Sequence, residues 1–256
     1  MLKFNLLRLP YDGQLSTSEI RNVWNQQTGY TNFHRWSGGG VKLEQENTLA
    51  AALFLFFQTG WFDGEGFGRM TNYFAGLKPP KYPFPVKADL VTAGEQVFRS
   101  ECADCHARDG SRVGRITPLS ELGVDDAYLK ASTADFLSTL SAIDDPPFSF
   151  TAQQKTDGFV NSTLEGIWLR APYLHNGSVP TLQDLLSAPV DRPETFLRGG
   201  ELLDGNRVGF VRDAASPVPA FRFDTRLRGN GNSGHIFGVG LSAAEKMALI
   251  EYLKTL

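Results

Sequence analysis

Apolar residues recur at helical spacing in two segments of this 256-residue chain. In the segment 89–99, Gly94 and Phe98 are four positions apart and therefore fall on one face of a helix. The segment 242–256 repeats apolar positions behind a Ser-x-x-Glu start, which is typical of a capped helix. Both patterns predict helices.

The rest of the chain alternates between short helical patterns and long stretches without a clear period. Further helices are expected at 16–24, 44–58, 72–77, 127–141 and 181–186. Strand signals are sparse, and only 207–211 predicts a short hairpin. The pattern therefore predicts a mostly α-helical protein with long loops.

A proline-rich stretch divides the chain. Residues 78–86 read Lys-Pro-Pro-Lys-Tyr-Pro-Phe-Pro-Val, and four prolines there forbid a helix and favour an extended linker. We therefore predict a first domain over 1–77, a linker over 78–88 and a second domain over 89–256.

Composition narrows the classes of function. The hydrophobic fraction of 41% and charged fraction of 21% are ordinary for a globular protein. A net charge of −3 argues against a nucleic-acid partner. The most apolar run, 49–57, is too short to cross a membrane.

The run Cys102-Ala-Asp-Cys105-His106 contains both cysteines of the chain. C-x-x-C-H is the signature of covalent haem attachment, in which two thiols form thioethers and the histidine binds iron. The alternatives are a redox dithiol and half of a zinc site, but a zinc site needs further nearby Cys or His ligands, and none follow. The motif predicts one haem c.

A second axial ligand for the iron must come from elsewhere. The candidates are His34, His175, His235, Met70 and Met247. His235 is the prediction, because glycines in the segment 231–238 let the backbone approach a flat ligand; the alternative is a surface histidine. The two methionines are expected to pack in the core.

The loop 170–182 is the second informative stretch. Arg170 and His175 are expected to contact the haem propionates, where charge-assisted hydrogen bonds are strong. The alternative is a structural turn in which the histidine caps the backbone.

Residues 1–10 lack the apolar core and cleavage site of a signal peptide. Because haem c is normally attached after export, we expect a periplasmic or extracellular protein and a chain that is a fragment or mature form of a longer one.

With these residues, the chain resembles the di-haem cytochrome c peroxidase superfamily, which includes MauG, and most closely its rubber-oxygenase-like branch. The resemblance is carried by 102–106, by the Ala-Pro-Tyr-x-His-x-Gly-Ser block within 170–186, and by 224–238 with the final helix. It implies a cytochrome c-like haem domain, preceded by a partial helical domain, in which the helices 89–99 and 242–256 cross. It also implies His235 as a haem ligand.

The N-terminal part resembles the end of the family's first haem domain, through 21–26, 33–38 and 43–44. The resemblance makes Trp36 a candidate electron relay between two haems, although Ser37 stands where the family has Asp; the alternative is a core tryptophan. It also implies calcium near Asn22 and 170–172, where Arg170 replaces a threonine.

The family's first C-x-x-C-H, which serves the reactive haem, is absent from this chain. The expected function is therefore single-electron transfer with a redox protein or a second haem domain as partner. The alternatives are an enzyme acting on peroxide or oxygen, and a sensor with an exchangeable sixth ligand. Peroxide turnover by this chain alone is not expected.

Overall fold

The computed structural model describes residues 24, 69, 72–73, 76–131, 144–145, 148–149, 155–200, 202–211, 213 and 220–256. The helix predicted at 44–58 lies outside these residues, and so does that at 16–24 apart from Trp24. No helix in the described ranges is long and apolar enough to cross a membrane.

The described elements are mostly short. The helices are α3 (Ala88–Glu101), α4 (Ala103–His106), α5 (Leu119–Leu122), α6 (Ala127–Ala131), η2 (Ile167–Leu169), α8 (Leu182–Leu185), η3 (Pro189–Asp191) and α9 (Ala243–Leu253). The strands are β1 (Ile116–Pro118), β2 (Asp144–Asp145), β3 (Phe148–Ser149), β4 (Gly158–Val160), β5 (Thr195–Arg198), β6 (Leu203–Asp204), β7 (Gly209–Phe210) and β8 (Phe221–Asp224).

The prediction of a mostly α-helical fold is wrong. Among the described residues 33% are helical and 14% are in strands. The strands form four two-stranded antiparallel pairs, β1–β4, β2–β3, β5–β8 and β6–β7. Each strand has two to four residues, which is too short for a period of two to stand out in the sequence.

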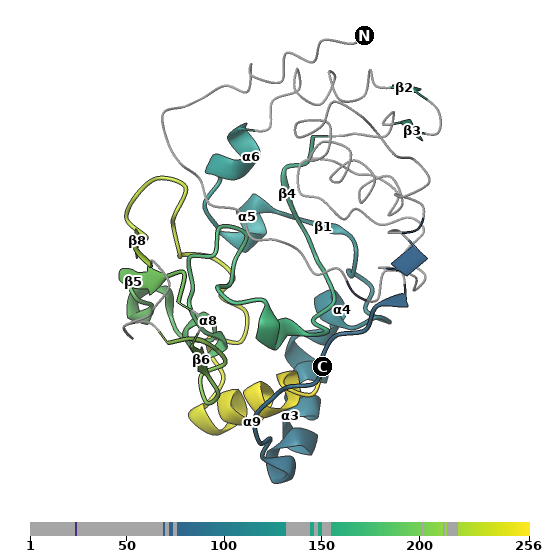
Figure 1. The fold of residues 1–256 in the computed structure, drawn as a ribbon, viewed down its shortest axis with the longest axis vertical. Helices are drawn as coiled ribbons and strands as arrows, with labels where there is room; N and C mark the ends of the chain where they lie inside the picture. Colours follow the sequence, from purple (N-terminus) through teal and green to yellow (C-terminus); the bar gives the residue numbers. More distant parts are fainter. Residues whose placement is uncertain are drawn as a thin grey trace.

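The two longest described helices cross, as the resemblance implied. A Cβ on Gly94 of α3 would lie 2.6 Å from the carbonyl carbon of Ala248 and 2.8 Å from Cβ of Tyr252, both on α9. Phe98 packs on Tyr252 one turn further along, with ring centres 5.2 Å apart. In Figure 1, α3 and α9 lie side by side at the foot of the molecule, and α4 follows directly above α3.

Several local predictions are confirmed. Segment 181–186 contains α8, whose N-cap Thr181 accepts a hydrogen bond from the backbone N–H of Asp184. The capping box of Ser242 and Glu245 starts α9. Strands β6 and β7 form the hairpin expected near 207–211, and α6 covers the first five residues of the helix expected at 127–141.

The proline-rich segment forms no helix or strand and bends at 83–84, and it packs against the part of the chain that follows it. Tyr82 lies edge-on to Trp168 at 5.5 Å between ring centres, and its hydroxyl donates to the carbonyl of Gly205 at 2.7 Å. The indole of Trp168 donates to the carbonyl of Pro80 at 3.2 Å. The division into domains at 78–88 stays a prediction.

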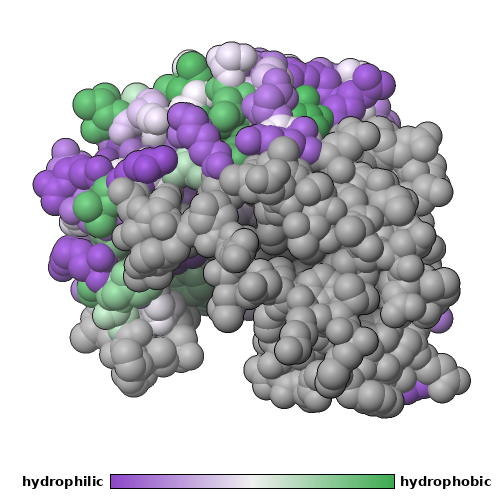
Figure 2. Space-filling model, turned by 90° about the horizontal axis from the view of Figure 1, so that it is seen from above, coloured by the Kyte–Doolittle hydropathy of each residue, from purple (hydrophilic) through white to green (hydrophobic). Residues whose placement is uncertain are grey.

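The described core is one cluster, formed mainly by α3, η2, α8 and α9. Its members include Phe98, Trp168, Tyr173, Leu182 and Leu249. Figure 2 shows hydrophobic and hydrophilic residues mixed over the described part of one face. Exposed apolar residues include Val190 and Leu227, and single exposed apolar side chains are normal on a protein surface.

Candidate functional site

A partly open cavity of about 480 Å³ is lined by residues of this core. Core residues Tyr173, Leu182 and Leu249 line it together with the C-x-x-C-H motif. Protein interiors are packed to near crystal density, and voids larger than a water molecule are few. A void of this size and apolar lining therefore fits a large, mostly apolar ligand.

The C-x-x-C-H motif begins at the end of α3 and continues as α4. Backbone N–H groups of Cys102 and His106 donate to the carbonyls of Phe98 and Cys102, so the helical course is almost unbroken. Both thiols line the cavity. Burial raises the pKa of Cys102 to about 11 and also raises that of Cys105. A depressed pKa, which is typical of reactive redox cysteines, is found at neither thiol.

His106 is held in one tautomer. Its Nδ1 lies 2.7 Å from the carbonyl oxygen of Ser162, and because a carbonyl only accepts, Nδ1 carries the proton. The lone pair of Nε2 is then available to a metal. Burial and the positive charge of Arg170 lower the pKa of His106, although this hydrogen bond acts to raise it. The lowered pKa keeps the imidazole neutral.

His235 also lines the cavity, and its ring centre lies 6.2 Å from that of His106. Imidazole nitrogens bind a metal at about 2 Å, so two imidazoles on opposite sides of one ion have ring centres roughly 6 Å apart. The separation therefore leaves room for one iron between the rings. Among the described residues, none forms a hydrogen bond with the buried Nδ1 of His235. Burial lowers the pKa of His235 to about 4.

The backbone that carries His235 is held on two sides. The N–H of His235 donates to the carbonyl of Leu122 at 2.8 Å. A Cβ at Gly234 would lie 2.5 Å from that same carbonyl oxygen, so only glycine allows this close approach. On the other side the loop contacts Arg192, described below. His235 itself has φ of +49°, which is a costly conformation for a residue with a side chain.

Arg170 and His175 both line the cavity, and their contact with haem propionates stays a prediction. Arg170 donates to the carbonyl of Thr163 at 3.3 Å. His175 stacks on Phe159 with ring centres 4.3 Å apart, and its buried Nε2 has no hydrogen-bond partner in the part of the chain that the structure describes. Burial lowers the pKa of His175 to about 4, so it is neutral near pH 7. A propionate oxygen would satisfy that nitrogen.

Other predicted residues are not brought to the cavity or are not described. Trp36, Asn22, His34 and Met70 lie outside the described residues. Met247 is 46% exposed and does not line the cavity. Of the predicted calcium residues, 170–172 are described, and the described ranges contain no cluster of three or more His, Cys, Asp or Glu side chains.

Sequence reasoning missed several residues of the site. Ser162 holds His106, Phe159 and Tyr128 pack around His175, and Arg192 holds the loop before His235. Ser162 acts through its backbone carbonyl, and the others come from loops or short elements without a motif. No signal in the sequence pointed to them.

One family matches part of the chain. Residues 158–197 match a family described as "RoxA-like, cytochrome c-like". The match covers β4, η2, α8 and the Ala-Pro-Tyr block, which form one wall of the cavity and its surroundings. It supports a cytochrome c-type haem domain and, with it, haem c and electron transfer.

Two relatives from Sinorhizobium fredii are similar over longer stretches. The uncharacterized protein y4iM is 30% identical over 282 residues, which cover 93% of this chain and 64% of the relative. The uncharacterized protein y4iJ is 30% identical over 254 residues, covering 72% of this chain and 42% of the relative. The chain therefore spans less than two thirds of either relative's length.

Proposed function

We propose that this chain is a c-type cytochrome unit with one covalent haem, bound through Cys102 and Cys105, that transfers single electrons. His106 and His235 would bind the haem iron, and the partner is a redox protein or a second haem domain of a di-haem peroxidase- or oxygenase-like protein. Because haem c is normally attached after export, the location is the periplasm or the outside of the cell. The single observation that carries the proposal is the 6.2 Å separation of the two imidazoles across a core cavity.

Each residue has a distinct part. The two cysteine sulfurs anchor the cofactor at the end of α3, and the carbonyl of Ser162 orients His106. The guanidinium of Arg170 and the ring of His175 lie on the cavity wall, where they can bind carboxylates. When bound, haem supplies an iron that changes oxidation state by one electron, and burial and ligand type set its potential.

With both histidines bound to the iron, the haem would support electron transfer rather than chemistry on small molecules. One observation favours the alternative of an exchangeable ligand. The φ of +49° at His235 means that the loop releases conformational energy if the ring leaves the iron. In a sensor or an enzyme, peroxide, oxygen or another small molecule would take that place.

Ferric EPR of the haem-loaded chain tests the proposal. We expect a low-spin signal in the wild type and its loss to a high-spin signal in His235→Ala, with haem still covalently attached. Met247→Ala is the matched control, because Met247 is exposed and away from the cavity. An unchanged low-spin signal in His235→Ala would remove His235 as the ligand.

Ligand binding and turnover separate the alternatives. A six-coordinate wild type that binds cyanide or carbon monoxide slowly supports electron transfer, and rapid binding supports the sensor. Steady-state peroxide turnover by this chain alone would support the enzyme, and we expect none.

A further inference from the structure

We propose that Arg192 is a positioning residue that keeps His235 at the iron and so prevents small anions and gases from replacing it. The inference rests on the proposed ligation by His235. Arg192 lies outside the C-x-x-C-H and Ala-Pro-Tyr motifs. It directly follows η3 and is only 3% exposed.

The guanidinium of Arg192 contacts the backbone carbonyls of His235 and of the three residues before it. Nη1 donates to the carbonyls of Asn232 at 2.5 Å and Gly234 at 2.7 Å, and it lies 3.5 Å from that of Ser233. Nη2 donates to the carbonyl of His235 at 3.2 Å. One side chain thus contacts four consecutive carbonyls of the loop.

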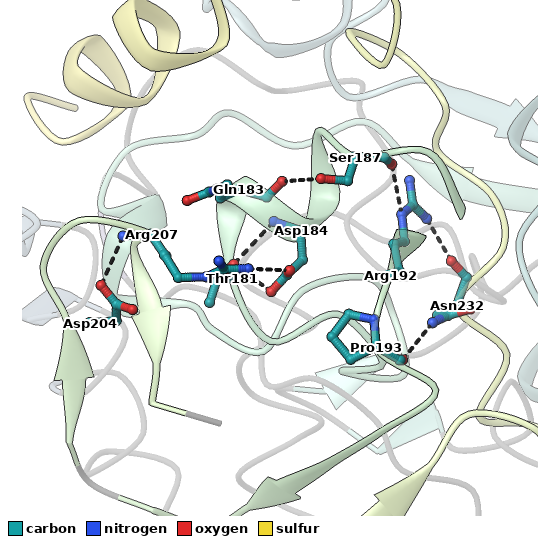
Figure 3. A network of polar contacts seen from close by, with 9 residues as sticks. All are labelled: Thr181, Gln183, Asp184, Ser187, Arg192, Pro193, Asp204, Arg207 and Asn232. Atoms are coloured by element: carbon teal, nitrogen blue, oxygen red, sulfur yellow. Dashed lines mark hydrogen bonds and ion pairs between the residues drawn. The ribbon is translucent and has the colours of Figure 1, made fainter. Parts of the chain in front are cut away.

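The same guanidinium is anchored on its other side to α8 and its C-terminal end. Nε donates to the carbonyl of Ser187 at 3.2 Å, and Nη2 donates to that of Leu185 at 3.1 Å. Figure 3 shows Arg192 between Ser187 and Asn232, whose amide donates in turn to the carbonyl of Pro193. Arg192 therefore ties the His235 loop to α8, which lies beside the cavity.

Only arginine can make this set of contacts. The planar guanidinium has five N–H donors in fixed directions, whereas lysine has three donors on a flexible stem. Burying a charge is costly unless it is fully hydrogen-bonded. Here every hydrogen-bond acceptor that the structure gives for Arg192 is a backbone carbonyl, which fits a role in shaping backbone rather than in pairing charges.

The strain at His235 makes such a clamp necessary. Its positive φ favours another loop shape. The loop is also held by the hydrogen bonds of His235 N–H to Leu122 and of the Asn232 amide to Pro193, but it is Arg192 that binds the carbonyls of Gly234 and His235. Without Arg192 these carbonyls lose their donors. We therefore expect the loop to relax and the ring of His235 to leave the iron more often.

A neighbouring arginine supplies the matched control. Arg207 donates to the carboxylate of Asp184 at 2.5 Å, and Thr181 binds the same carboxylate (Figure 3). Arg207→Met removes a buried charge interaction at α8 and leaves the hydrogen bonds between Arg192 and the His235 loop in place. The Arg207→Met variant therefore shows how a loss of stability alone changes the spin state of the iron and the rate of cyanide binding.

The experiment compares haem-loaded Arg192→Met, Arg192→Lys, Arg207→Met and His235→Ala, at a temperature where far-UV circular dichroism matches the wild type. The readouts are the ferric spin state by EPR and the rate of cyanide binding. We expect Arg192→Met to bind cyanide at least tenfold faster and to gain high-spin signal, and Arg192→Lys to show a smaller change. Arg207→Met should match the wild type.

Three results would overturn the inference. The first is an Arg192→Met variant whose EPR spectrum and cyanide-binding rate equal those of the wild type, while those of His235→Ala are altered. If Arg192→Met does not fold, the same result in Arg192→Lys counts. The proposed ligation by His235 would then stand without the role of Arg192. The second is an equal increase in Arg207→Met, which would mean general loosening. The third is an unaltered His235→Ala, which removes the ligand and the inference together.

Discussion

Replacing Gly94 by alanine tests the helix crossing that places the C-x-x-C-H motif. An added Cβ would lie 2.6 Å from the carbonyl carbon of Ala248 and 2.8 Å from Cβ of Tyr252, and it would overlap the Ala248 carbonyl oxygen. Ordinary contacts begin at 3.4 Å. Because the obstructing atoms are backbone and Cβ, α9 must move away from α3 by about 1 Å, which a close-packed core resists.

The magnitude follows from two opposing effects. Overpacking costs about 1–3 kcal/mol, whereas alanine gains about 0.5–1 kcal/mol over glycine inside a helix. Because the added Cβ meets backbone rather than a flexible side chain, the cost lies in the upper part of its range, and we expect a net loss of about 1–2 kcal/mol for Gly94→Ala. In a domain of this size, each kcal/mol lowers the midpoint of thermal unfolding by roughly 2–4 °C.

The assay is thermal unfolding of the haem-loaded chain, followed by far-UV circular dichroism. Gly240→Ala is the control, because a Cβ at Gly240 meets no atom within 4 Å. We expect the control to keep the wild-type midpoint or exceed it. A Gly94→Ala midpoint equal to or above that of the wild type would refute the close crossing.

Two further predictions concern other contacts of the same domain. Burial acts to raise the pKa of Glu251, but the hydrogen bond from buried Lys254 helps to lower it below its usual value. Because the pKa of Glu251 is depressed in the folded state, its ionised carboxylate stabilises the fold. That contribution is fully present above the unfolded-state pKa of about 4.3 and is lost as pH falls through the folded-state pKa. Glu251→Gln should therefore cost about 3 kcal/mol at pH 7, because it leaves a buried ammonium unpaired, and should flatten the acid decline in urea unfolding; an equal decline in both proteins would contradict this. Trp168→Leu should release the segment that carries Tyr82 and speed tryptic cleavage after Lys81, and an unchanged cleavage rate would show that the segment is held by other contacts.

The sequence by itself determined the local features whose cause is local. The Cys102–His106 spacing depends only on one helical turn. Helix α9 begins with a capping box, because Ser242 and Glu245 satisfy each other's backbone donors. Prolines within 78–86 exclude a helix through their own geometry. The candidate His235 could also be proposed, since adjacent glycines let its backbone approach a flat ligand.

The tertiary structure alone decided the balance of helix and strand. Strands of two to four residues are held by partner strands that are distant in the sequence. Likewise, the 6.2 Å between His106 and His235 arises where α4 meets a loop about 130 positions later, and no local pattern encodes that distance. Ser162 acts through its own backbone carbonyl, and Arg192 donates to the backbone carbonyls of other residues, a group that every residue possesses. Their roles therefore leave no mark on side-chain pattern and are visible only when the chain is folded.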